Sequence, residues 1–206
     1  MSIQAYDDLN SMQIDVLKEI GNIGSGNAAT ALSGMLGRTI DMVVPNVQVI
    51  DYSDAIEFAG GPESIVAGIL VRLEGDIEGM IMFLLEKPFA ETIISSFMGT
   101  VSDDFVALNE YERSALTEMG NIMAGAYLSA ISQLTDLFIN ISVPSLTIDM
   151  LGAIMSVPAI EFAQVGDKVL LINESFIIDN KHIKSNMILI PEVSSLDILL
   201  KKLGVN

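Results

Sequence analysis

The chain has 206 residues, with 27 acidic against 10 basic side chains, a net charge of −17, no cysteine and one histidine. Disulfides, thiolate metal sites, cysteine nucleophiles and sites that need two imidazoles are therefore excluded. The negative field repels phosphate backbones, so nucleic acid is not an expected partner. No stretch reaches the roughly 20 apolar residues of a spanning helix, and the N-terminus lacks signal-peptide features. We expect no membrane insertion and a cytoplasmic location.

Helices and strands alternate in the first half of the chain. Apolar residues recur at helical spacing after residue 11, and alternating runs of strand type follow. Gly75 and Asp76 join two strands in an expected hairpin. In chain order we expect a helix over 11–36, a strand over 43–52, a short helix over 54–60, strands over 64–74 and 78–86, and a helix over 88–99.

The second half repeats this order after an acidic stretch, Ser102 to Glu112, that links the halves. A helix is predicted over 147–156 because Ile148, Leu151 and Ile154 share a helical face. In chain order we expect a helix over 109–135, a strand over 137–143, a helix over 147–156, strands over 158–164, 168–178 and 183–190, and a helix over 194–203.

An internal repeat explains the similarity of the halves. Residues 15–49 match residues 114–148 without gaps at an offset of 99 positions, and the strings EIGNI and EMGNI are nearly identical. We therefore predict an α+β fold, internally duplicated about a pseudo-two-fold axis, with a mainly antiparallel sheet and long helices packed on it. Residues 1–206 would form one domain made of two repeats, about 11–100 and 110–204.

Each repeat contains a polar stripe on its first long helix. Residues at spacings of four, three and four lie on one narrow side of a helix, here beside a broad apolar face. Glycine at the end of the stripe allows another backbone to approach closely. The stripes consist of Asp15, Glu19, Asn22 and Gly26 in the first copy and Ser114, Glu118, Asn121 and Gly125 in the second.

A solvated helix face is the simplest interpretation of one such stripe. Asparagine and glycine both weaken a helix, however, and both recur at equivalent positions. An asparagine carboxamide can orient a water molecule because it donates and accepts hydrogen bonds at once. A glutamate can pair with a cation or act as a base. Each pair is therefore better interpreted as half of a site, completed by a partner.

The motif resembles a known family. Asp/Ser-x3-Glu-x2-Asn-x22-Pro occurs once with Asp15, Glu19, Asn22 and Pro45 and once with Ser114, Glu118, Asn121 and Pro144. This spacing is similar to that of the CheC/CheX/FliY family of bacterial chemotaxis phosphatases, and the likeness covers essentially the whole chain. Two copies without an added flagellar-switch domain are most similar to the CheC members.

The resemblance implies hydrolysis of the aspartyl phosphate on the response regulator CheY. Asn22 and Asn121 would orient the attacking water, and Glu19 and Glu118 would engage the regulator's lysine. The family resemblance implies no cofactor on this chain and Mg²⁺ on the regulator. It also implies the receptor deamidase CheD as a partner, with Asp149 on the polar side of a helix over 146–155.

Other functions remain open at this point. A non-enzymatic adaptor that binds the deamidase or the phosphorylated regulator would use the same Glu/Asn pairs for docking. A structural flagellar-switch component is disfavoured by the missing extra domain. The glycine-rich segment 21–27 follows no strand and lacks the P-loop lysine, so it is not expected to bind phosphate.

Overall fold

The computed structural model describes residues 5–161 and 168–205. A short 3₁₀ turn, Tyr6–Asp8, precedes the first repeat. The elements of the first repeat are α1 (Ser11–Leu36), β1 (Ile40–Asp51), α2 (Tyr52–Phe58), β2 (Ile65–Gly75), β3 (Gly79–Leu85) and α3 (Lys87–Met98). Those of the second are α4 (Glu110–Thr135), β4 (Ile139–Ile141), β5 (Ser145–Met150), α5 (Leu151–Glu161), β6 (Lys168–Ile178), β7 (Lys181–Pro191) and α6 (Val193–Lys202).

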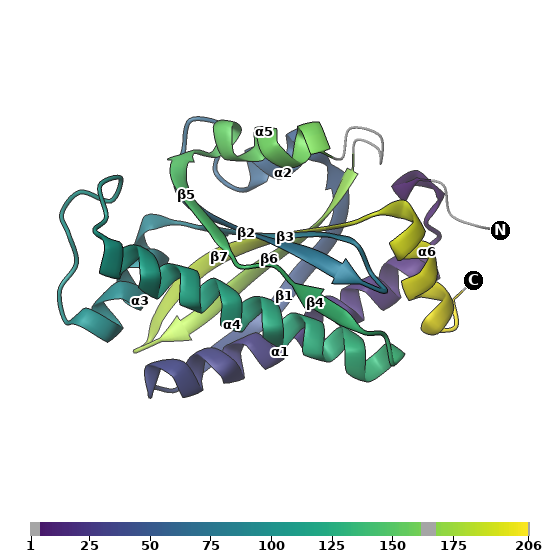
Figure 1. Ribbon diagram of the computed structural model, residues 1–206, viewed down its shortest axis with the longest axis horizontal. Helices are drawn as coiled ribbons and strands as arrows, with labels where there is room; N and C mark the ends of the chain where they lie inside the picture. The colour runs from purple at the N-terminus through teal and green to yellow at the C-terminus, as the bar shows by residue number, and fades with distance from the viewer. Residues whose placement is uncertain (1–4, 162–167, 206) are drawn as a thin grey trace.

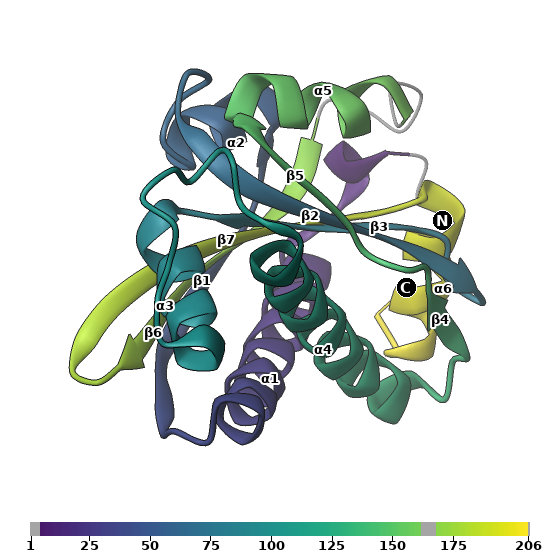
Figure 2. The ribbon, with the colours of Figure 1, turned by 60° about the vertical axis from the view of Figure 1, so that its left-hand side comes forward.

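These elements form three layers (Figure 1). A seven-stranded sheet lies in the middle, with α1 and α4 on one face and α2 and α5 on the other, as Figure 2 shows from a second direction. α3 and α6 flank α1 and α4 at opposite ends of the molecule in Figure 1. The predicted fold class, α+β with an antiparallel sheet and an internal duplication, is confirmed.

The sheet runs through both repeats in the order β1-β6-β7-β3-β2-β4, and β5 also pairs with β2. Asp51 of β1 pairs with Lys168 of β6 just as Met150 of β5 pairs with Ile65 of β2. The first strand of each repeat therefore completes the half-sheet of the other repeat. This exchange makes the two copies depend on each other for their strand hydrogen bonds.

Both faces of the sheet are covered, so its central strands are apolar on both sides. Residues of β3 alternate between the two cores: Ile81, Phe83 and Leu85 face the α1/α4 layer, and Met80, Met82 and Leu84 face the α2/α5 layer. The core on the α1/α4 side is the larger one. It includes Phe89 of α3, whose ring stacks on Phe176 of β6 with centroids 5.4 Å apart.

Two predicted elements were wrong. The helix expected over 147–156 begins only at Leu151, because residues 145–150 form β5 and pair along β2. The strand expected over 158–164 is helical as far as Glu161, with Pro158 inside α5, and its remainder lies outside the described residues. In both places pairing and packing outweigh the local pattern. Among the described residues, none of the helices has the length and apolar character needed to cross a membrane.

Candidate functional site

The two longest helices pack against each other and against the same face of the sheet. α1 and α4 run antiparallel and side by side (Figures 1 and 2). Their close approach depends on Gly24, because an added Cβ there would lie 2.2 Å from the ring of Tyr127. Next to it, the hydroxyl of Ser25 is hydrogen-bonded to the hydroxyl of Tyr127. The helices thus bury one side each and leave the other side free for a partner.

The stripe on α1 lies on that free side. Asp15 and Glu19 are exposed, and Asn22 is half-buried. Leu17 and Ile20, two of the apolar residues expected in the core, are buried. At about 100° per residue the stripe is centred nearly opposite to the buried side of the helix, not beside it as predicted. The stripe is therefore more accessible than the sequence pattern suggested.

The stripe on α4 is more open still. Ser114, Glu118 and Asn121 are all exposed. Residues three apart on a helix are neighbours, so the carboxylate and the carboxamide of each pair can reach one bound partner together. Among residues 5–161 and 168–205, no hydrogen bond or ion pair joins the pair on α1 to the pair on α4. The structure thus presents one Glu/Asn pair on each of the two helices.

The first position of the motif differs between the copies. The carboxylate of Asp15 forms an ion pair with the ammonium group of Lys18 at 3.2 Å. Both side chains are well exposed, so this pair contributes little to stability. Ser114 takes the place of Asp15 in the second copy and brings no charge. The stripe on α1 therefore starts with an acid neutralised by a neighbouring lysine.

The glycines of the two helices fall into two classes. Gly21 and Gly120 lie against the sheet: an added Cβ would come within 2.7 Å of Val47 at the first and 2.5 Å of Ile69 at the second. At Gly26 and Gly125, which end the stripes, an added Cβ would meet nothing within 4 Å. The first class has a packing role inside the fold. The second has none, although each glycine weakens its helix by roughly 1 kcal/mol relative to alanine.

The motif prolines interrupt the outer strands of the sheet. Pro45 falls where the register of β1 with β6 shifts, between Val43 and Asn46. Pro144 falls in the break between β4 and β5. Proline has no N–H for a strand ladder, which explains an interruption at both places. Both prolines therefore shape the outer strands.

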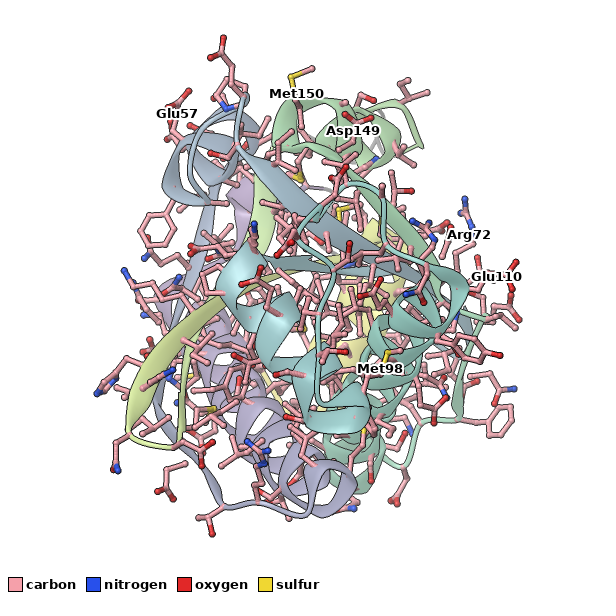
Figure 3. All side chains as sticks on the ribbon, turned by 90° about the vertical axis from the view of Figure 1, so that its left-hand side faces the viewer. Glu57, Arg72, Met98, Glu110, Asp149 and Met150 are labelled. Carbon is pink, nitrogen blue, oxygen red and sulfur yellow. The ribbon has the colours of Figure 1, made fainter. Side chains whose placement is uncertain are left out.

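Asp149 lies on a different surface from the Glu/Asn pairs. It is an exposed residue of β5, so its predicted position on the polar side of a helix was wrong. With Arg72 and Val157 it lines a cavity of about 400 Å³ between α5 and the sheet. Figure 3 shows Asp149 and Met150 at the end of the molecule that α5 covers.

A buried polar group that the sequence did not reveal connects α1, α4 and β6. The hydroxyl of Tyr127 donates a hydrogen bond to Oε1 of Glu174. No partner among the described residues binds Oε2 of Glu174. Burial raises the pKa of Glu174 to about 7, and hydrogen bonds from Tyr127 and Ser25 oppose that rise only in part. Burial, and then the charge of Glu174, raise the pKa of Tyr127 as well.

The described part of the chain contains no group of three or more His, Cys, Asp or Glu side chains that could hold a metal ion. Each Glu/Asn pair offers one carboxylate and one carboxamide. Such a surface can bind and orient a water molecule or a cation.

Comparisons with a family model and with a curated protein both indicate CheC-like proteins. The model of the CheC-like family matches residues 12–49 and 112–148, which are the stripe-bearing segments of the two repeats. The chain is 36% identical over 206 residues to the CheY-P phosphatase CheC of Bacillus subtilis, covering 98% of each protein.

Solved structures share the fold. Thermotoga maritima FliY superposes with a TM-score of 0.74 at 25% identity, covering 96% of this chain and 98% of that one. The CheX–CheY–BeF3–Mg²⁺ complex from Borrelia burgdorferi contains a similar chain, with a TM-score of 0.53 at 21% identity, covering 81% of this chain and 94% of that one. The full-length identity to CheC and the double match to the family model show that this chain belongs to the CheC-like family.

Proposed function

We propose that this protein is a phosphatase for the phosphorylated response regulator CheY, with two half-sites. Glu19 with Asn22 forms one half-site and Glu118 with Asn121 forms the other. One observation carries the proposal: each pair lies on an open helix face that ends in a glycine with no packing role. Two costly glycines at equivalent open positions are explained if another molecule approaches there.

The asparagine orients the attacking water. Its carboxamide accepts one hydrogen bond from the water and can donate another to the phosphoryl group. The water oxygen attacks phosphorus, the bond from phosphorus to the aspartate carboxylate oxygen breaks, and the products are inorganic phosphate and the regenerated aspartate. Phosphoryl transfer needs positioning and charge stabilisation more than covalent chemistry, so one well-placed amide is enough.

The glutamate holds the regulator in register. Glu19 and Glu118 are both exposed, three residues before the asparagine of their half-site. A carboxylate there can form a charge-assisted hydrogen bond with a lysine in the regulator's own site. In this proposal the regulator also supplies Mg²⁺, which neutralises charge that develops on the phosphoryl oxygens.

The relatives support this assignment in two ways. The similar B. subtilis protein is named a CheY-P phosphatase, and its similarity extends over nearly the whole chain. The solved CheX complex contains CheY, BeF3 and Mg²⁺ together. A chain of this fold can therefore be captured with a regulator of that type.

The direct test is the decay of ³²P-labelled CheY with and without the protein. We expect the wild type to accelerate release of inorganic phosphate, and an Asn22→Ala, Asn121→Ala double variant to return the rate to that of CheY alone. Asn27→Ala is the matched control, because Asn27 lies on α1 outside the stripe and its equivalent, Ala126, is already alanine. No acceleration by the wild type would contradict the proposal.

An adaptor role at a second surface is a separate proposal. Exposed apolar residues lie near Asp149: Val157, which lines the same cavity, is 43% exposed, and Met150, the next residue of β5, is 46% exposed. A carboxylate within such a patch is typical of a protein interface. We propose that the receptor deamidase CheD binds here. An Asp149→Arg variant should lose CheD in a titration while keeping its phosphatase rate, and unchanged CheD affinity would exclude this surface.

A further inference from the structure

Two large apolar residues are exposed at equivalent positions in the first turns of α1 and α4. Met12 is 65% exposed and Tyr111 is 78% exposed. They are separated by the same offset that relates the two repeats, so each helix begins with one such residue. Tyr111 is the most exposed aromatic residue among those that the structure describes.

Both residues continue the stripes toward the helix start. Met12 precedes Asp15 by three positions, and Tyr111 precedes Ser114 by the same spacing. Residues at these spacings fall within about 80° of one another around a helix. Tyr111 and Asn121 lie ten positions apart in the sequence, or roughly 15 Å along the helix. A standard interface covers about 800 Å² on each partner, which is a disc of roughly 16 Å radius.

The turn that presents Tyr111 is held rigidly by a capping box. Oδ1 of Asn109 accepts hydrogen bonds from the backbone N–H groups of Tyr111 at 2.9 Å and Glu112 at 3.1 Å. The buried carboxylate of Glu112 accepts from the N–H groups of Asn109 and Ser102, both at 2.8 Å. The backbone of Tyr111 is fixed before any partner arrives, which lowers the entropic cost of binding.

The negative charge of this chain does not favour binding of a phosphorylated partner. The chain has a net charge of −17, and Glu110 lies at the surface beside Tyr111 at the start of α4 (Figure 3). Like charge slows the encounter and weakens binding. Uncharged contact area must compensate, and exposed tyrosine or methionine next to the Glu/Asn pair is suited to that role.

We propose that Met12 and Tyr111 are docking residues for phosphorylated CheY, Met12 at the first half-site and Tyr111 at the second. Tyr111 gives the second half-site the higher affinity. This inference rests on the proposed function. Tyrosine covers a large area with few rotatable bonds, whereas methionine must order a flexible chain. Both side chains are too exposed to contribute much to the packing of the fold.

The test isolates each half-site and separates binding from turnover. In an Asn22→Ala background only the second half-site works, and Tyr111→Ala should raise KM for phosphorylated CheY by roughly fivefold or more with kcat nearly unchanged. Tyr111→Phe should restore most of that loss. In an Asn121→Ala background, Met12→Ala should raise KM by a smaller factor. Phe138→Ala is the matched control, since Phe138 is 65% exposed but follows α4 at its far end.

Each outcome decides the proposal. An unchanged KM for Tyr111→Ala overturns it, as does an equal rise for Phe138→Ala, or a fall in kcat alone. If the wild type does not accelerate phosphate release, the proposed function fails, and direct titration with beryllofluoride-activated CheY then decides the docking role. Weaker binding by Tyr111→Ala supports it, and equal binding overturns it.

Discussion

α1 and α4 are copies of one helix that have diverged in one region and remained similar in another. Each has 26 residues and begins with an asparagine cap. Their outward stripes keep the Glu/Asn pair and the open glycine. The residues where the two helices cross have diverged. Tyr127 of α4 corresponds to Ala28 of α1, and Ser25 of α1 corresponds to Ala124 of α4.

Symmetry explains this difference. Near a pseudo-two-fold axis, equivalent residues lie close together, so two tyrosines would compete for one space. A large residue facing a small one fills such a space without voids. Gly24 provides the space for Tyr127 at this crossing. Far from the axis no such conflict arises, and the two outward surfaces could keep the same residues.

The largest expected effect is a difference in phosphatase activity between the two half-sites. Asn121 is exposed and Asn22 is half-buried, and the second helix also presents Tyr111. Loss of one preorganised group costs on the order of 10²–10³ in rate at its own site. Asn121→Ala should therefore remove most of the total phosphatase activity and Asn22→Ala the smaller share. Initial rates of phosphate release measure both, and equal losses would show that the half-sites contribute alike.

The next effect concerns the crossing, where only one copy has a buried acid. Glu174 has the buried valine Val71 at the equivalent position of β2. Its pKa rises from an ordinary 4.5 to about 7, so its contribution to stability is fully present below pH 4.5 and is lost as the pH rises through 7. Relative to Glu174→Gln, the wild type should lose on the order of 3 kcal/mol between pH 5 and pH 8.

Urea denaturation at both pH values gives the free energy of unfolding of each protein. Subtracting the value for Glu174→Gln from that for the wild type removes the contribution of the other carboxylates. A parallel pH dependence of wild type and Glu174→Gln would mean that Glu174 keeps one protonation state in this range.

The two classes of glycine should respond to alanine with opposite signs. Gly120→Ala places a Cβ 2.5 Å from a methyl carbon of the fully buried Ile69. Overpacking of this kind typically costs 1–3 kcal/mol. Gly125→Ala meets nothing within 4 Å and should stabilise α4 by about 1 kcal/mol. Urea denaturation of both variants checks the signs.

A larger side chain separates function from stability at the same position. Gly125→Leu should keep the fold but slow phosphate release by blocking the partner, while Gly34→Leu is a control on α1 with equally open surroundings. Normal activity of Gly125→Leu would exclude a close approach of the regulator at this glycine.

The internal repeat made most of the fold predictable. Periodicity and the common offset located α1 and α4 almost to the residue. The same offset contained the missing information about β5, because its equivalent segment in β1 was predicted as a strand. Apolar residues at 148, 151 and 154 have the spacing of a helical face. Only the pairing of residues 145–150 with β2 shows that this segment is a strand.

Other features could not be predicted because they depend on tertiary contacts. Gly21 and Gly26 are five positions apart in one glycine-rich segment, yet only Gly21 touches the sheet. Ser25, Tyr127 and Glu174 come from three elements that meet only after folding. Sequence patterns identify which residues share a face, but the partner of that face is decided by packing.

The smallest effect compares the two helix caps. Asn109 accepts hydrogen bonds from two backbone N–H groups, those of Tyr111 and Glu112, whereas Asn10 accepts one from Gln13. Replacing such a cap by alanine typically costs about 1 kcal/mol, so Asn109→Ala should lower Tm by roughly 2–4 °C and Asn10→Ala by less. Serine at either position, which can still accept these bonds, should restore the Tm.

The caps also connect stability to docking. Loss of the Asn109 cap frays the turn that presents Tyr111, so Asn109→Ala should raise KM at the second half-site. The matching change Asn10→Ala should leave the second half-site unaffected, since it loosens only the start of α1. Kinetics in the Asn22→Ala background distinguish the two variants. An equal KM for both would mean that Tyr111 docks without help from its cap, and that rigidity of this turn does not account for the difference between the half-sites.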